Sequence, residues 1–233
     1  MVFDRGKFHL ILQTEKLGRV PLNRGLLLEL PCFVMTYQEF KYLVKSDLYR
    51  HEGSRSRREL MQLLWRDPAF RYVFFFRLRA FARSHKGWKY FIYPLVVFYI
   101  SRLGVRYGIC IPQEATVGSG LYIGHWGGIW INREVVIGKN CVLSQNVTLG
   151  GISRGAHQGA PLVGDNVYFG PGAVVSGGIV VGDHALIGAN SLVTGDVPMG
   201  AVMVGNPAKA YATTGSGNFV RYADFEKEAE ALN

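Results

Sequence analysis

Six histidines occur in this chain of 233 residues, and His125 has the sequence context best suited to chemistry. It follows Ile123 and Gly124 and precedes Trp126 and two glycines. Imidazole titrates near neutral pH, so a histidine can take the proton from a hydroxyl group that acts as a nucleophile. The Gly-x-Ser-x-Gly sequence at residues 151–155 falls in a stretch expected to be a loop, not at the strand-to-helix turn of a serine nucleophile elbow, which favours direct transfer over a covalent serine intermediate. From residue type alone, the alternative is a histidine that merely faces solvent in a turn.

A repeat with a period of six residues must position this histidine. Beyond Cys110 an aliphatic residue or Phe recurs at every sixth position in three runs, and a small residue follows nearly every time. The runs are Ile111, Val117, Ile123 and Ile129; Ile131, Ile137, Leu143 and Leu149; and Val163, Phe169, Val175, Val181, Ile187 and Val193. One short strand and a turn per unit predict a prism of three flat parallel sheets, with one apolar side chain per unit on the axis. We therefore expect a mainly β fold, a parallel β-helix of a little over four coils.

The period breaks at two places. Two extra residues lie between Ile123 and Ile137, and the fourteen-residue step from Leu149 to Val163 leaves eight residues beyond one unit. The second insertion reads GGISRGAHQGAP over residues 150–161 and contains His157. Its glycine-rich, polar composition predicts a loop that projects from the wall and carries function on a rigid scaffold. No comparable context surrounds the other histidines, which are His9, His51, His85 and His184.

A helical region precedes the repeat, over residues 36–107. Thr36 and Glu39 have the spacing of a capping box ahead of an apolar-periodic run. A second, short helix is expected to end at Asp67, and a third, aromatic helix follows it. Four arginines are expected to form the solvated face of the third helix: Arg71, Arg77, Arg79 and Arg83.

The basicity of the chain is concentrated in this helical region. The formal net charge is +9, yet residues 36–106 hold 15 Lys and Arg against 5 Asp and Glu, whereas residues 107–233 hold 6 against 9. No zinc-finger, RNP or helix-turn-helix pattern accompanies the positive charge, so we expect no nucleic-acid partner. The three cysteines, an odd and widely spaced set, favour neither a disulfide framework nor a metal site and indicate a reducing compartment.

Residues 91–105 form the most apolar stretch of the chain. It contains Pro94 and Arg102 and is shorter than the roughly 20 residues that a membrane-spanning helix needs. A buried helix is the first expectation, and a helix that lies on an anionic membrane surface is the alternative. Residues 1–13 lack the continuous apolar core of a secretory signal, so the expected location is the cytoplasm, with peripheral attachment to the inner face of the membrane as an extension.

Five motifs carry a family resemblance: Ile123-Gly-His-Trp-Gly-Gly, Ser144-Gln-Asn-Val-Thr-Leu-Gly-Gly151, Val163-Gly-Asp-Asn-Val, Ile187-Gly-Ala-Asn-Ser-Leu-Val and Val204-Gly-Asn-Pro-Ala-Lys209. Together they resemble the hexapeptide-repeat acyltransferases, and within them the serine acetyltransferases and the sugar O-acetyltransferases of capsule and lipopolysaccharide synthesis. The resemblance covers about residues 111–210. It implies a left-handed β-helix, a homotrimer, acetyl-CoA as the donor and active sites in clefts between neighbouring subunits.

The resemblance places the family's catalytic histidine on His125, as the general base. Gly124 stands where serine acetyltransferases have an aspartate, and Ala160 stands where they have a second active-site histidine. Both losses remove groups that recognise a small amino acid, so a sugar hydroxyl is the expected acceptor. The residues expected to contact the acceptor are Trp126, Asn146 and His157.

For the donor, the resemblance implies a thin cleft along the β-helix. The residues expected to contact acetyl-CoA are Ala189, Thr194 and Lys209, with Gly150 and Gly151 near the thioester and the developing oxyanion. No metal is expected. The sequence does not identify the group that orients His125: a backbone carbonyl would suffice, and Glu134 is the alternative.

The expected function is therefore acetyl-CoA-dependent O-acetylation of a sugar hydroxyl in surface polysaccharide synthesis. Serine O-acetylation in cysteine biosynthesis is the enzymatic alternative, and a non-catalytic β-helix scaffold is the alternative of another class. The expected organisation has an uninterpreted segment at 1–35, the helical region at 36–107, the β-helix at 108–212 and a C-terminal tail at 213–233.

Overall fold

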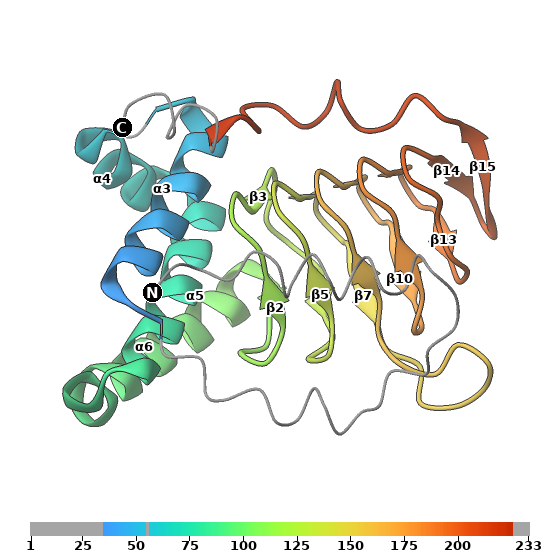
Figure 1. Cartoon of the computed structure of the whole chain (residues 1–233). Helices are drawn as coiled ribbons and strands as arrows, with labels where there is room; N and C mark the ends of the chain where they lie inside the picture. The colour runs from blue at the N-terminus through green and yellow to red at the C-terminus, as the bar shows by residue number, and fades with distance from the viewer. Residues whose placement is uncertain (1–34, 55, 226–233) are drawn as a thin grey trace. The chain divides into compact units, whose positions relative to one another are not determined.

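The computed structural model describes residues 35–54 and 56–225, which form four helices followed by a β-helix (Figure 1). The helices are α3 (Tyr37–Glu52), α4 (Arg57–Arg66), α5 (Pro68–Ser84) and α6 (Lys86–Tyr107). They gather at one end of the β-helix, and α6 leads into the first coil through Gly108, whose φ of 61° ends the helix. The uninterpreted segment 1–35 lies outside the described residues, apart from Met35.

The predicted start of the first helix and the predicted stop at Asp67 are both present. The expected capping box is present at α3, since Thr36 accepts the backbone N–H of Glu39 and the Glu39 carboxylate accepts the backbone N–H of Thr36. Asp67 separates α4 from α5, and its Oδ1 accepts the N–H groups of Ala69 and Phe70 at 2.8 and 3.0 Å. Pro68 then starts α5, where its missing N–H costs nothing.

Three sheets form the walls of the β-helix, and each coil adds one strand to each sheet (Figure 1). The first sheet consists of β1 (Ile109–Cys110), β4 (Ile129–Ile131), β7 (Thr148–Gly150), β10 (Val174–Ser176) and β13 (Leu192–Val193). The second consists of β2 (Thr116–Val117), β5 (Val136–Ile137), β8 (Leu162–Val163) and β11 (Val180–Val181). The third consists of β3 (Tyr122–Ile123), β6 (Val142–Leu143), β9 (Tyr168–Phe169), β12 (Leu186–Ile187), β14 (Val202–Gly205) and β15 (Ala208–Ala212). Successive coils pair in parallel, and the antiparallel hairpin of β14 and β15 ends the stack.

The residues of the six-residue repeat fill the axis of the prism, as predicted. In the third sheet Ile123, Leu143, Phe169 and Ile187 stand in register, and all are fully buried. The first break in the period falls at β4, where Ile129 and Ile131 are both buried and the strand pairs with β1 and β7. The second break is a loop after β7 that is closed by an antiparallel bridge between Ile152 and Gly159.

Arg77 of α5 is buried, which contradicts the solvated face expected for the arginines of this helix. Its side chain is 3% exposed, and its Nε and Nη2 donate to the two carboxylate oxygens of Asp47 in α3 at 2.9 and 3.2 Å. Its Nη1 and Nη2 also donate to the carbonyls of Val117 and Gly118 in the first coil, at 2.8 and 2.6 Å. Asp47 Oδ1 accepts the N–H of Leu121 in the same coil at 2.9 Å. Two helices and one coil therefore share a single buried ion pair.

Two further side chains of α3 extend this contact with the first coil. Ser46 Oγ accepts the N–H of Gly120 at 3.0 Å, and Arg50 Nε donates to the Gly120 carbonyl at 3.2 Å. Burial raises the pKa of Asp47, and Arg77 and the N–H of Leu121 oppose that effect. We call Ser46, Asp47, Arg50 and Arg77 the helix–coil clamp.

Helix α6 is mostly exposed, which contradicts the first expectation of a buried helix. Its buried side is a narrow line of Val96, Ile100, Leu103 and Tyr107, and the last three of these join the core of the first coil. None of the described helices combines the length and the apolar character that crossing a bilayer requires. Arg102 and Arg106 lie on the exposed side of α6.

The segment after β15 returns along the outside of the β-helix toward the helices (Figure 1). Ser216 N–H donates to the carbonyl of His184 in the fourth coil at 2.9 Å, and the carbonyl of Ala223 accepts Asn140 Nδ2 in the second coil at 3.2 Å. Phe225 then packs against Tyr49 of α3 at a ring distance of 5.7 Å. The C-terminal segment thus ties the coils to the helical region.

We predict that Asp47→Asn lowers the free energy of unfolding by about 3–5 kcal/mol, because it leaves the Arg77 charge buried without its partner. Urea unfolding followed by circular dichroism measures the loss. The matched control is Glu114→Gln at the exposed pair that Glu114 forms with Arg133 at 3.3 Å, where the expected change is below about 1 kcal/mol. Equal effects at the two sites would contradict the role assigned to the clamp.

Candidate active site

His125 lies in the turn that follows β3, at the corner between the third and the first sheet. Its side chain is exposed and borders a pocket of about 350 Å³. Three other elements line this pocket: the end of α3, the junction of α4 and α5, and strand β3. The lining residues are His51, Leu63, Arg66, Asp67, Pro68, Tyr122, Gly124, His125 and Trp126.

Of the three residues predicted to contact the acceptor, only Trp126 lines the pocket. Trp126 lines the pocket with His125, is 51% exposed and packs on Tyr107 at a ring distance of 5.7 Å. Asn146 sits one coil further along the same corner, where its N–H donates to the Gly127 carbonyl at 2.7 Å, and it does not line the pocket. His157 lies in the exposed loop after β7, at a different corner of the prism.

No hydrogen bond or ion pair holds the His125 ring within residues 35–54 and 56–225. Glu134, the alternative orienting group, follows β4 and therefore sits at the next corner of the prism. Its own N–H donates to Asn132 Oδ1 at 2.9 Å, which fixes that turn locally. The structure thus separates Glu134 from the pocket, and the His125 ring is free to meet a substrate.

The residues predicted to bind acetyl-CoA lie at two different corners of the prism and in the terminal hairpin. Gly150 ends β7, Gly151 follows it and Thr194 follows β13, so all three lie along the corner between the first and the second sheet. Ala189 follows β12 at the corner that carries His125, three coils away, which corresponds to about 14 Å at the usual strand spacing. Lys209 lies in β15, opposite Val204 in the terminal hairpin.

Within one chain, the structure does not bring His125 next to the Gly150–Thr194 corner. The first sheet lies between the two corners, because β3 precedes this sheet and β7 and β13 belong to it. The space beside the glycines of the Gly150–Thr194 corner differs, since a Cβ atom on Gly151 would meet Asn132 Nδ2 at 2.8 Å. A Cβ atom placed on Gly195 would meet nothing within 4 Å, and one on Gly150 would meet Ser176 Oγ at 3.5 Å.

Sequence reasoning missed the two residues that make this pocket polar, His51 and Asp67. Asp67 was recognised only as the end of a helix, and His51 was set aside for lack of context. In the structure His51 Nδ1 lies 3.5 Å from Asp67 Oδ2, and the His51 side chain is 5% exposed. Burial lowers the pKa of His51 to about 4, although the Asp67 carboxylate opposes the shift. The imidazole is therefore neutral at pH 7.

A scan against family models matches residues 160–195 to the bacterial transferase hexapeptide (six repeats). Among curated proteins, the chain is 37% identical over 152 residues to serine acetyltransferase 5 of Arabidopsis thaliana, covering 62% of this chain and 49% of that protein. It is 31% identical over 204 residues to the chloroplastic serine acetyltransferase 1 of the same plant, covering 84% of this chain and 62% of that one. The chain thus spans between about half and two thirds of the length of these relatives.

Among solved structures, serine acetyltransferase from Brucella abortus in complex with coenzyme A is similar, with a TM-score of 0.63 and 26% identity. The match covers 77% of this chain and 70% of that one. A second structure, titled as a serine acetyltransferase complex with CoA, has a TM-score of 0.57 and 29% identity and covers 73% of this chain and 68% of that chain.

The repeat and these neighbours confirm the expected left-handed β-helix with a helical region before it. They also confirm the resemblance on which the sequence assignment of His125 rests. The chain carries the hexapeptide repeat of bacterial transferases on the fold of the serine acetyltransferases.

The lowered pKa of His51 predicts a specific acid sensitivity of the fold. Because unfolded His51 takes up a proton near pH 6.5 and the folded residue only near pH 4, stability is lost as the pH falls between these values. Between pH 7 and pH 5 the free energy of unfolding should fall by about 2 kcal/mol less in His51→Gln than in the unmodified protein. Urea unfolding at both pH values measures it, with His157→Gln in the exposed loop as the control. An unchanged pH dependence in His51→Gln would show that folded His51 titrates normally.

Proposed function

We propose that this chain is an acetyl-CoA-dependent O-acetyltransferase. The observation that carries the proposal is the pocket beside His125, which combines an accessible imidazole with groups of both charges on the fold of the serine acetyltransferases. In the glycine corner formed by Gly150, Gly151 and Gly195, the open space beside Gly195 and Gly150 suits the thin pantetheine arm of the donor. Ser153 stands in a Gly-x-Ser-x-Gly sequence, but it lies in the loop after β7, which leads into strand β8 and not into a helix, so it is not a nucleophile elbow and one transfer step without an acyl-enzyme is favoured.

In the proposed reaction His125 removes the proton from the acceptor hydroxyl as its oxygen bonds to the thioester carbonyl carbon. Backbone N–H groups near Gly150 and Gly151 stabilise the negative charge on the carbonyl oxygen. The C–S bond then breaks, the acetyl group stays on the acceptor, and the proton held by His125 passes to the CoA thiolate. No group is oxidised or reduced, and the imidazole returns to its neutral form.

Serine is the acceptor that we favour. Asp67 and Arg66 line the pocket beside His125, and these side chains complement the ammonium and the carboxylate of an amino acid. The relatives and solved neighbours named above are serine acetyltransferases, which supports the same choice over the sugar first expected from the sequence.

A saccharide hydroxyl is the second candidate, because the pocket also departs from the serine pattern. Gly124 and Ala160 lack the acidic and imidazole groups that the resemblance assigns to serine recognition. The half-exposed ring of Trp126 offers an apolar face of the kind against which the carbon side of a sugar ring packs.

We further propose that the active unit is a homotrimer. His125 and the glycine corner lie on different corners of one prism, so a base and a thioester meet only when the corner of one subunit faces the other corner of its neighbour. Each subunit offers both corners once, so a ring of three subunits around a threefold axis would repeat this contact three times.

His125→Asn is predicted to lower kcat by about 10²–10⁴-fold, because it removes the base and leaves the turn intact. The loss of thioester absorbance with acetyl-CoA and serine, or with UDP-N-acetylglucosamine in a parallel arm, measures turnover. His184→Asn is the control, since His184 lies outside the pocket at φ 59°, a conformation that asparagine tolerates.

Calorimetry and light scattering should show that His125→Asn still binds CoA and remains trimeric. Faster turnover of the sugar than of serine would reverse the choice of acceptor. Binding of acetyl-CoA without transfer to either acceptor would overturn the proposed activity and favour a non-catalytic scaffold.

A further inference from the structure

His51 lines the pocket that holds His125, and one nitrogen of its ring is buried without a partner. The side chain sits in the last turn of α3, with its ring 5.1 Å from that of Phe70 and 4.5 Å from that of Tyr122. These contacts fix the ring and leave it 5% exposed. Nε2 is buried and has no hydrogen-bond partner within residues 35–54 and 56–225. A buried polar atom without a partner destabilises a fold, so its presence at a pocket points to a ligand group.

The neighbours of His51 define which kind of group Nε2 can receive. Nδ1 faces the Asp67 carboxylate at 3.5 Å, which favours the tautomer with its proton on Nδ1. In the neutral ring Nε2 is then a hydrogen-bond acceptor. Its partner must be an N–H or O–H donor, and the nearby carboxylate favours a donor that carries positive charge.

We propose that His51 determines acceptor specificity by accepting, at Nε2, a hydrogen bond from a donor group next to the hydroxyl that is acetylated. This inference rests on the proposed acetyltransferase function. In serine the donor is the ammonium group, and in a saccharide it is a neighbouring hydroxyl. His51 acts by positioning the acceptor, whereas His125 moves the proton.

The test compares His51→Phe, which keeps the ring contacts with Phe70 and Tyr122, with the conservative variant His51→Gln. His51→Phe should raise the KM for the acceptor at least about tenfold and leave the KM for acetyl-CoA within twofold, and His51→Gln should recover part of the loss. The control is His85→Phe, since His85 packs on Phe81 at 4.1 Å outside the pocket. An unchanged acceptor KM in His51→Phe, or an equal rise for both substrates, overturns the proposal.

A second measurement separates this inference from the proposed function, because it needs no turnover. In a ¹⁵N-labelled protein, adding serine or UDP-N-acetylglucosamine should shift the Nε2 resonance of His51, because Nε2 then accepts a hydrogen bond. The His125→Asn variant should show the same shift. A shift without turnover would retain the binding role of His51 and reject the transferase. The absence of a shift with both probes would reject the role of His51, whatever the activity.

A separate observation concerns the exposed side of α6, away from this pocket. Large apolar side chains are spread over the exposed part of the helix, and Val105 and Phe91 are 87% and 79% exposed. The others are Trp88, Tyr90, Ile92, Leu95, Phe98 and Tyr99. An apolar face of this size is unusual on a soluble surface and marks a contact with another apolar phase or molecule.

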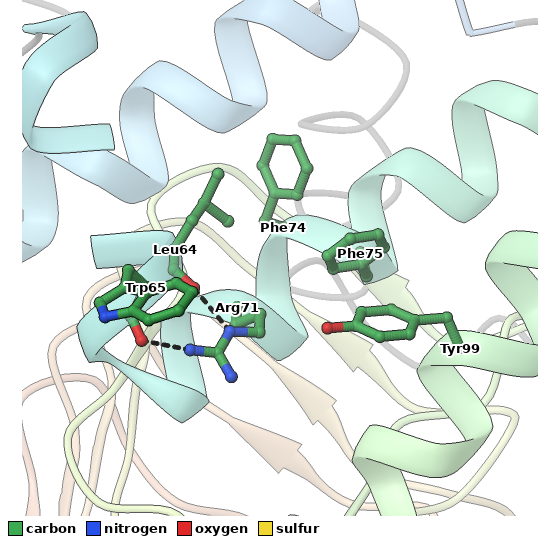
Figure 2. A pocket seen from close by; sticks show the side chains of 6 residues that line it. All are labelled: Leu64, Trp65, Arg71, Phe74, Phe75 and Tyr99. Carbon is green, nitrogen blue, oxygen red and sulfur yellow. Dashed lines mark hydrogen bonds between the residues drawn. The ribbon is translucent and has the colours of Figure 1, made fainter. Parts of the chain in front are cut away.

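The apolar face continues into a groove of about 580 Å³ lined by α4, α5 and α6. Figure 2 shows Phe74, Phe75 and Tyr99 on one side and Leu64 and Trp65 on the other. Arg71 lies between them and donates to the carbonyls of Leu64 and Trp65. Its charge is thereby held at the helix end, and the Trp65 ring is left exposed.

All the charged residues of α6 are basic. Lys89, Arg102 and Arg106 are exposed, Arg102 lies 5.1 Å over the Phe98 ring, and the sequence of α6 contains no Asp or Glu. Cations interspersed among exposed aromatic and aliphatic side chains match the boundary between acyl chains and anionic headgroups. We infer that this face, residues 88–106 with the adjoining groove, binds the surface of an anionic bilayer.

Cosedimentation with phosphatidylcholine vesicles, with and without 30% phosphatidylglycerol, tests this inference. The chain should bind the anionic vesicles, and Phe91→Ser with Leu95→Ser should weaken binding more than tenfold. Tyr211→Ser, at an exposed aromatic residue of β15 in the terminal hairpin, is the control and should change nothing. Failure to bind anionic vesicles overturns the inference. If the double variant instead lowers the mass of a protein assembly, the face joins copies of this chain.

Discussion

The buried ion pair between Asp47 and Arg77 fixes the helices on the β-helix. Two charges lose much solvation when they are buried, so such a pair is kept only when its geometry is good and its remaining hydrogen-bonding groups are satisfied. Here the carbonyls of Val117 and Gly118 and the N–H of Leu121 complete the shell. Because these backbone groups belong to the first coil, the ion pair allows α3 and α5 one orientation on the prism.

That orientation creates the pocket. It places the end of α3 and the α4–α5 junction beside the turn of His125, so that Asp67 and His125 line the same pocket. The C-terminal segment supports the same arrangement, since it contacts the fourth and second coils and ends against Tyr49 of α3. The glycine corner lies elsewhere on the prism, which accounts for the need of a second subunit to complete the proposed site.

The β-helix was predictable because each repeat contributes one buried side chain at a fixed step, as Ile123, Leu143 and Phe169 show. The capping box at Thr36 and the stop at Asp67 were also predictable, since both are local signals. The ion pair and the pocket were not. Arg77 resembles a surface arginine until it meets Asp47, and His51 is 74 positions from His125. Contacts set by how helices dock leave no periodic trace in the sequence.

The most direct test of the account is the position of the acceptor in a crystal structure of the complex with CoA and serine. The account predicts that the serine hydroxyl lies about 3 Å from a ring nitrogen of His125. The rest of the acceptor should lie against Asp67 and Trp126, and the CoA thiol should come from the glycine corner of a neighbouring subunit. An acceptor bound away from the helical region, or a thiol that reaches it along the same chain, would contradict the account.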